Sequence, residues 1–256
     1  MFFRGGRKYG EEAGRGPRRK LKASLTVMRA SRRQFLKVPL TLAGLAACRA
    51  GWAGEAEGPS AAGASKRQTS LVVLQPLGAT VKVEELAAVS SAIAAFYAVT
   101  VTLAPPLGLP ASAFYPKRQR YRAEKLLDFL VAEGNQYARV TLGLTAVDIS
   151  TTKAPYEDWG ILGLATIDGR SAVLSSFRCK RRAKSAEHAR VRFAKTAVHE
   201  LGHAFGLEHC PNAGCIMHDG EGSVMTTDTE RDLCADTRAR LTAAGMLRAG
   251  AVSPFP

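Results

Sequence analysis

The chain has 256 residues, of which 46% are hydrophobic, and a formal net charge of +14. Residues 1–50 hold 13 lysines and arginines against 2 acidic residues, so the remainder carries a net charge of only +3. The basic excess belongs mainly to the N-terminal part and therefore gives no reason to expect a nucleic-acid partner.

The first 50 residues predict an export signal. Residues 1–27 are rich in glycine and arginine and lack periodicity, which is typical of disorder, and Met28 offers a second start. Arg32 and Arg33 precede a ten-residue run from Val38 to Ala47, which is apolar apart from one threonine and too short to span a bilayer. The pattern resembles the consensus of twin-arginine signals. Proteins with such a signal are exported in the folded state. We expect a periplasmic or cell-surface protein. The alternative is a basic amphipathic start to the first domain.

Cys48 closes the sequence Leu45-Ala-Ala-Cys48, which resembles a bacterial lipobox. We interpret Cys48 as a lipidation site that would attach the mature protein to a membrane. The alternative is ordinary cleavage near Ala50, which would discard this cysteine.

Residues 51–69 are small, rich in glycine, alanine and serine, and without periodicity, which predicts a flexible linker. The following residues 70–256 are enough for one globular domain, which we expect to be monomeric.

Hydrophobic periodicity in this domain predicts an α+β fold. Strands are expected over residues 70–77, 98–105, 138–150, 159–169 and 171–179, and helices over residues 82–97 and 117–133. The last strand is expected at the edge of a sheet, where Ala172–Ser176 would pair with an extended peptide. A further helix follows from Ser185 or Ala186, with Ser185 as its cap.

This last helix carries the strongest chemical signal, the sequence HELGHAFGLEH. His199 and His203 are four residues apart and therefore lie on one helix face, where two imidazoles can hold one metal ion. Gly206 is placed to end the helix in a left-handed conformation, so that the chain returns His209 as a third ligand. Three protein ligands leave one position open, as in catalytic zinc sites. Glu200, beside the first ligand, is placed to take a proton from water.

The motif and the residues after it resemble the metzincins and, more narrowly, the archaemetzincins. The narrower resemblance rests on HExxHxxGxxH, His209-Cys210, Cys215-Ile216-Met217 and Cys234. It extends over about Ser70 to Leu241 and includes looser matches such as VTLGLTAVDIS and ILGLATIDGRSAVLSSFR. It implies a mixed twisted sheet with backing helices and an active-site helix. It also implies zinc as cofactor, a peptide or protein as substrate, and Met217 as the residue that packs beneath the metal without binding it.

The same resemblance implies a second zinc ion held by Cys210, Cys215 and Cys234. Thr237 stands where the family has a fourth cysteine, and a neutral hydroxyl is a poor zinc ligand. His218, Asp236, Cys179 or water would then complete the site. The rival outcome is a disulfide between Cys210 and Cys215, with Cys234 free.

We therefore predict a zinc-dependent peptidase. His218 has two interpretations, contact with a developing oxyanion or an ordinary surface position, whereas His188 is expected to face solvent. Two other functions remain, a catalytically idle surface zinc-binding module and a zinc-storing lipoprotein. Glu200 argues against the first because an idle site needs no base, and the small number of ligands argues against the second.

Overall fold

The computed structural model describes residues 70–78 and 81–256. All the described residues belong to one compact unit. The predicted export signal with Arg32 and Arg33, the predicted lipidation site Cys48 and the predicted linker lie outside the described residues. Within these residues, no helix combines the length and the apolar character that crossing a membrane requires.

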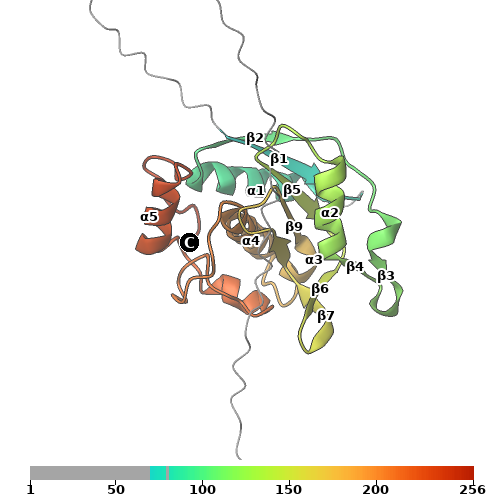
Figure 1. The fold of residues 1–256 in the computed structure, drawn as a ribbon. Coiled ribbons are helices and arrows are strands. Elements are labelled where there is room, and N and C mark those ends of the chain that lie inside the picture. The colour runs from blue at the N-terminus through green and yellow to red at the C-terminus, as the bar shows by residue number, and fades with distance from the viewer. Residues whose placement is uncertain (1–69, 79–80) are drawn as a thin grey trace, which may run out of the picture. The chain divides into compact units, whose positions relative to one another are not determined.

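A five-stranded mixed sheet forms the centre of the domain, with strand order β2-β1-β5-β9-β8 (Figure 1). Its strands are β1 Ser70–Pro76, β2 Val99–Leu103, β5 Val140–Thr145, β8 Gly163–Ala165 and β9 Ser171–Ser175. The pairs among β2, β1, β5 and β9 are parallel, and only β8 runs antiparallel to its neighbour. Strand β8 is therefore an edge with unpaired backbone groups.

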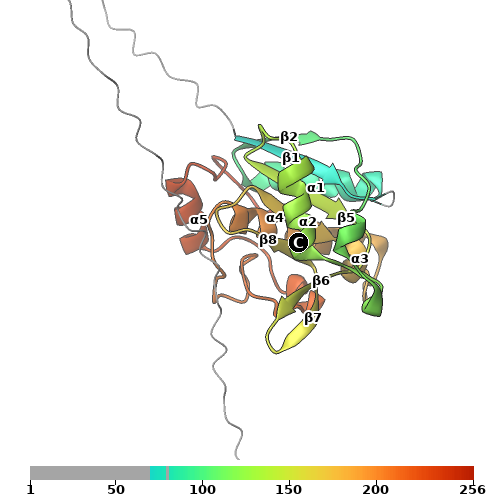
Figure 2. The ribbon, with the colours of Figure 1, turned by 45° about the vertical axis from the view of Figure 1, so that its right-hand side comes forward.

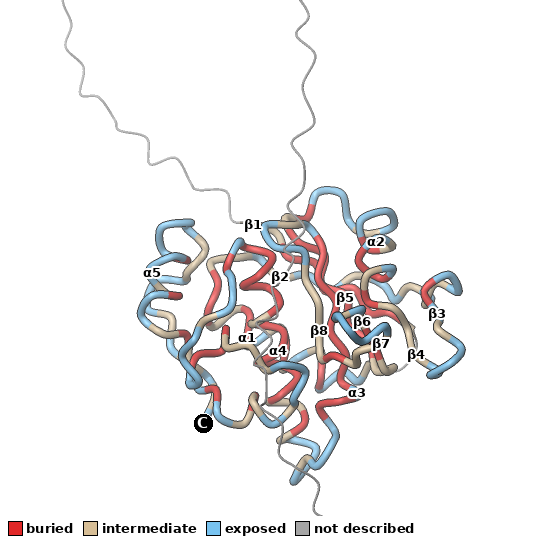
Figure 3. The backbone as a smooth tube through the Cα atoms, turned by 60° about the horizontal axis from the view of Figure 1, so that its bottom comes forward, coloured by how far each residue is buried: buried red, intermediate tan, exposed pale blue. Residues whose placement is uncertain are grey.

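Helices cover both faces of this sheet (Figure 2). Helices α1 Val83–Phe96 and α4 Ala186–Ala204 share the larger apolar core with the sheet, whereas α2 Ala123–Glu133 packs on the other face. The split follows the two-residue period of the strands, since Leu174 of β9 points into the first core and Val173 into the second. Figure 3 shows the result, with β5 and α4 largely buried between exposed outer segments.

A second, four-stranded sheet has the order β3-β4-β6-β7. Its strands are β3 Phe114–Tyr115, β4 Arg120–Arg122, β6 Ile149–Lys153 and β7 Tyr156–Ile161, with the 3₁₀ turns η1 Ala111–Ala113 and η2 Pro116–Arg118 beside them. Asp148 connects it to the rest of the domain, because this carboxylate accepts a hydrogen bond from Arg178 Nε at 2.7 Å and forms an ion pair with Arg120, whose Nε lies 2.9 Å away. The C-terminal part contains η3 Val224–Asp228 and the short helix α5 Ala235–Ala243.

The predicted edge strand over residues 171–179 is wrong in place and length. Strand β9 is buried between β5 and β8, and the chain turns into α3 Ser176–Cys179 because Ser175 Oγ caps it by accepting the Phe177 N–H at 3.1 Å. The edge on this side of the sheet is β8, which the turn at Asp168–Gly169 joins to β9.

Three other predicted elements are divided in the structure. The helix expected over 117–133 begins only at Ala123, because the preceding residues form η2 and β4. The strand expected over 138–150 becomes β5 and β6, and that over 159–169 becomes parts of β7 and β8. The strands predicted at 70–77 and 98–105 and the helix at 82–97 are confirmed within one or two residues at either end. The α+β class and the mixed sheet are also confirmed.

Candidate metal centre

Helix α4 presents the candidate site, and its two ends are built as the sequence predicts. Ser185 Oγ accepts the His188 N–H at 3.0 Å and caps the first turn. At the other end Gly206 has φ +92°, and the Leu207 N–H returns to the Gly202 carbonyl at 3.0 Å. This is a Schellman ending, which reverses the chain directly after His203.

The reversal brings the three histidines together. The Nε2 atom of His203 lies 3.0 Å from that of His199 and 3.2 Å from that of His209. His199 and His203 come from adjacent turns of α4, and His209 comes from the segment after Gly206. Three nitrogens that converge on one point can bind a single ion.

Backbone carbonyls fix the orientation of two of the rings. His199 Nδ1 lies 2.6 Å from the Ile216 carbonyl, and His203 Nδ1 lies 2.8 Å from the Leu207 carbonyl. Because a carbonyl only accepts, both Nδ1 atoms must donate, which leaves each Nε2 with its lone pair toward the shared point. This tautomer is the one that metal binding requires.

Burial keeps the same two rings neutral. It lowers the pKa of His199 to about 3 and that of His203 to about 4, and the neighbouring histidines add to both effects. His209 is more exposed, and burial lowers its pKa as well. Neutral nitrogen ligands in a three-coordinate arrangement with an accessible side fit a catalytic zinc ion.

Glu200 lies on the same helix, packed against the edge strand. A Cβ atom on Gly163 of β8 would lie 2.5 Å from Glu200 Oε1 and 2.6 Å from its Cγ, so only glycine fits there. Burial raises the pKa of Glu200 to about 8. Sequence reasoning missed Gly163 because its contact with Glu200 joins segments 37 positions apart.

Met217 packs against α4 at Gly202, next to the two helix histidines. Its side chain is fully buried. A Cβ atom on Gly202, the residue before His203, would lie 2.5 Å from the Met217 Sδ. The preceding residue supplies the Ile216 carbonyl that holds His199. The Met217 segment therefore supports the first histidine while its sulfur packs against the helix backbone.

The three C-terminal cysteines also meet, with ligand atoms within 4.8 Å of one another. Cys210 Sγ is 3.4 Å from Cys234 Sγ, and Thr237 Oγ1 is 3.2 Å from Cys234 Sγ and 3.5 Å from Cys215 Sγ. All three cysteines are free thiols, so the rival Cys210–Cys215 disulfide is absent. Thr237 therefore occupies the fourth corner of the cluster.

The other proposed fourth ligands are engaged elsewhere. Cys179 is buried at the end of α3, and its thiol contacts the Ser175 carbonyl at 3.6 Å. Asp236 is exposed and pairs with Arg240 at 3.0 Å, and His218 Nδ1 lies 3.1 Å from the Cys210 carbonyl. None of them belongs to the metal-type clusters among the described residues.

His188 does not simply face solvent as predicted. Its Nε2 lies 2.7 Å from Asp228 Oδ1, and Arg192 holds the same carboxylate with Nε at 2.7 Å and Nη2 at 2.6 Å. Hydrogen bonds from Arg192 hold the pKa of Asp228 well below its usual range. The sequence could not reveal this contact, which ties η3 to α4.

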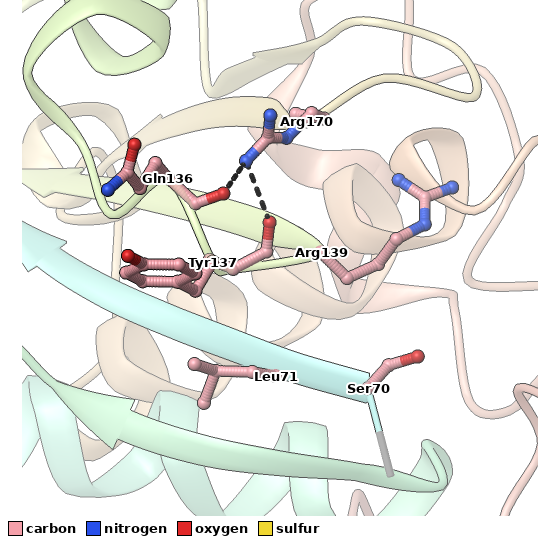
Figure 4. A pocket seen from close by; sticks show the side chains of 7 residues that line it. Ser70, Leu71, Gln136, Tyr137, Arg139 and Arg170 are labelled. Atoms are coloured by element: carbon pink, nitrogen blue, oxygen red, sulfur yellow. Dashed lines mark hydrogen bonds between the residues drawn. The ribbon is translucent and has the colours of Figure 1, made fainter. Parts of the chain in front are cut away.

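A separate hollow of about 440 Å³ lies at the start of β1 and β5 and is lined by Ser70, Leu71, Gln136, Tyr137, Ala138, Arg139 and Arg170 (Figure 4). Its arginines already donate to the backbone, since Arg170 binds the Gln136 and Ala138 carbonyls. Arg139 binds the Gly169 carbonyl at 2.6 Å and that of Ala204 at 3.2 Å. Arg139 therefore ties this region to the end of α4, and both arginines of the hollow are engaged by backbone carbonyls.

Comparison with known families decides the identity of the fold and the class of enzyme. Residues 83–236, more than half of the chain, match peptidase family M54. The chain belongs to this family. It is a zinc metallopeptidase, as the sequence predicted.

Relatives of this peptidase are archaemetzincins. The chain is 33% identical over 174 residues to an archaemetzincin from Haloquadratum walsbyi, covering 64% of this chain and 95% of that protein. It is similar in structure to archaemetzincin from Methanopyrus kandleri, with TM-score 0.62 and 25% identity over 71% of this chain and 98% of that chain. Archaemetzincin from Archaeoglobus fulgidus, solved as a complex with malonate, gives TM-score 0.57 and 27% identity over 66% of this chain and 99% of that one.

Proposed function

We propose that His199, His203 and His209 hold one catalytic zinc ion and that Glu200 is the general base of peptide hydrolysis. The observation that carries this assignment is the convergence of three Nε2 atoms, two of them with their tautomer fixed by backbone carbonyls. Zinc, when bound, supplies Lewis-acid chemistry, because it polarises a carbonyl and makes water easier to deprotonate near neutral pH.

The protein's own part of the reaction is proton transfer and substrate placement. Glu200 is buried, and no described side chain donates a hydrogen bond to its carboxyl group, so burial makes it a stronger base than an exposed glutamate. It can accept a proton from water and then pass that proton to the leaving amine. The nearby backbone of β8 has free edge groups to which an extended peptide can add as a further strand. This role replaces the one expected for Ala172–Ser176.

Two substitutions separate the proposed base from the proposed ligands. Glu200→Ala should keep one tightly bound zinc ion while peptide hydrolysis falls by orders of magnitude, because this residue is not a ligand. His203→Ala should lose metal and activity together. Metal analysis and peptide hydrolysis assays on the same preparations check both statements. Loss of zinc in Glu200→Ala, or activity equal to that of the unmodified protein, would contradict the assignment.

We further propose that Cys210, Cys215 and Cys234 bind a second, structural zinc ion, with the Thr237 hydroxyl or water at the fourth corner. Although burial opposes it, hydrogen bonds from Thr237 lower the pKa of Cys234 to about 7, which favours the thiolate that a metal needs. Because Cys210 follows His209 directly, a metal there would stiffen the turn that presents this histidine. Anaerobically purified protein should contain close to two zinc ions per chain, and Cys215→Ser close to one. One zinc ion in both would refute the second site.

For the cellular location we propose twin-arginine export followed by lipidation at Cys48. The support is the sequence pattern alone, namely Arg32 and Arg33, the short apolar run and Leu45-Ala-Ala-Cys48. Replacing Arg32 and Arg33 by lysine should retain the protein in the cytoplasm. Cys48→Ala should convert a membrane-associated protein into a soluble one in detergent-phase partitioning, and an unchanged distribution would remove the lipid anchor from the proposal.

A further inference from the structure

The hairpin formed by β6 and β7 reaches the segment that follows Met217. In Figures 1 and 2 it projects from the domain beside the orange segment that contains η3. The contact is close, because a Cβ on Gly222, whose φ is +79°, would lie 2.5 Å from Trp159 Nε1. The same segment carries Asp219, whose Oδ2 lies 3.8 Å from Nδ1 of the proposed ligand His209. The hairpin therefore stands directly beside the metal centre.

A β-bulge decides which side chains the hairpin presents. Thr151 pairs with Trp159 and Lys153 pairs with Tyr156, so β7 contains one more residue than β6 between these two pairs. The extra residue places Tyr156 and Trp159 on one face, which regular alternation would not do. Their rings stack with centroids 4.9 Å apart, and Lys153 Nζ lies 5.8 Å from the Trp159 ring. The result is an aromatic surface with a cation over it.

This cation forms no close ion pair with a carboxylate of the described residues, and Asp219 senses its charge only from a greater distance. Among residues 70–78 and 81–256, no carboxylate lies within 4.0 Å of Lys153 Nζ, although the side chain is half-buried. The neighbouring Asp158 is already held by Arg120 at 3.0 Å, and Asp219 faces His209. A half-buried charge without a close partner is stabilised when a ligand supplies the opposite charge.

We propose that Lys153 determines substrate specificity by binding a carboxylate of the peptide, seated against the Tyr156–Trp159 pair. This proposal rests on the proposed peptidase function and adds to it the class of substrate. The carboxylate belongs either to an aspartate or glutamate side chain or to the C-terminus of the peptide. Strand β7 leads through Leu162 directly into the edge strand β8, so a peptide paired with β8 runs past this hairpin.

The first test measures selectivity in the zinc-loaded full chain. One pair of peptides differs only in a glutamate or a glutamine side chain, and a second pair only in a C-terminal carboxylate or amide. Comparison of the two pairs shows which source of the carboxylate Lys153 binds. Lys153→Met should lower the ratio of kcat/KM between charged and neutral peptides by about tenfold, the value expected for one hydrogen bond to a charged group. Lys117→Met, a change at an exposed lysine of η2, is the control and should leave the ratio unchanged. Lys153→Glu should favour peptides that carry lysine or arginine.

The second test measures binding without turnover. Trp159 is one of two tryptophans, and Trp52→Phe leaves it as the sole tryptophan, which can be excited selectively over the tyrosines. In the zinc-loaded Glu200→Gln protein with this change, a peptide ending in glutamate should alter Trp159 fluorescence at about tenfold lower concentration than its neutral glutamine-amide counterpart. Lys153→Met should abolish that difference. Hydrolysis of no peptide at all would sink the peptidase function and leave this binding test to decide. Equal affinity for both peptides, or a selectivity ratio unaltered by Lys153→Met, would overturn the role of Lys153.

Discussion

Gly163→Ala is a small change that should disable the proposed base without touching the proposed ligands. The new Cβ would lie 2.5 Å from Glu200 Oε1, 2.6 Å from Cγ and 2.7 Å from Cδ, whereas ordinary contacts begin at 3.4 Å. The carboxyl group must therefore withdraw by about 1 Å, and its burial leaves little room. A misplacement of about 1 Å costs roughly a hundredfold in rate. We expect kcat to fall by about that factor, equivalent to about 2.7 kcal/mol of barrier.

The assay compares kcat on a fluorogenic peptide, zinc content and circular dichroism for the unmodified protein and the variant. The matched control is Gly108→Ala, because a Cβ there has no atom within 4 Å. Zinc content should stay unchanged in both variants, since the three histidines are not displaced. If Gly163→Ala keeps kcat within threefold of the unmodified value, the carboxyl group of Glu200 does not need its observed position, and the reasoning fails.

Three further predictions follow from the same contacts. Gly202→Ala should push Met217 away, because its Sδ would lie 2.5 Å from the new Cβ, and should lower the melting temperature, as measured by calorimetry. In metal-free protein burial raises the pKa of Glu200, so its contribution to the free energy of unfolding should fall by about 1.4 kcal/mol per pH unit from pH 4.5 to about 8. Urea titrations over this pH range should show that Glu200→Gln lacks this fall. The same dependence of unfolding free energy on pH in both proteins would count against it. Thr237→Cys should slow zinc release from the cysteine cluster to a chelator, because a thiolate replaces a hydroxyl; release at the original rate would mean that Thr237 is not at the fourth corner.

The sequence predicted those parts of the site that depend on local geometry. Helix α4, with its cap at Ser185 and its left-handed ending at Gly206, is specified by a few neighbouring residues. The meeting of the three histidines therefore followed from their spacing. The cysteine cluster was implied by family resemblance, and the structure adds that Thr237 occupies its fourth corner.

Contacts between segments that are distant in the chain could not be predicted from the sequence. A run such as Ser171–Ser175 reads the same whether a strand lies at the edge or in the interior, because its apolar side chains are buried on both faces and only the sheet order decides. The contacts of Gly163 with Glu200 and of Trp159 with Gly222 likewise exist only after folding. The bulge that turns Tyr156 and Trp159 to one face also has no signal in the sequence.

The central claim, that the three histidines and Glu200 form a working peptidase centre, is tested most directly by incubation of the zinc-loaded protein with a mixed peptide library and identification of the cleavage sites by mass spectrometry. We predict defined cleavages by the zinc-loaded protein, none after zinc removal, and none by Glu200→Ala at unchanged zinc content. Cleavage that persists without zinc or without Glu200, or no cleavage by the loaded protein, would contradict the account.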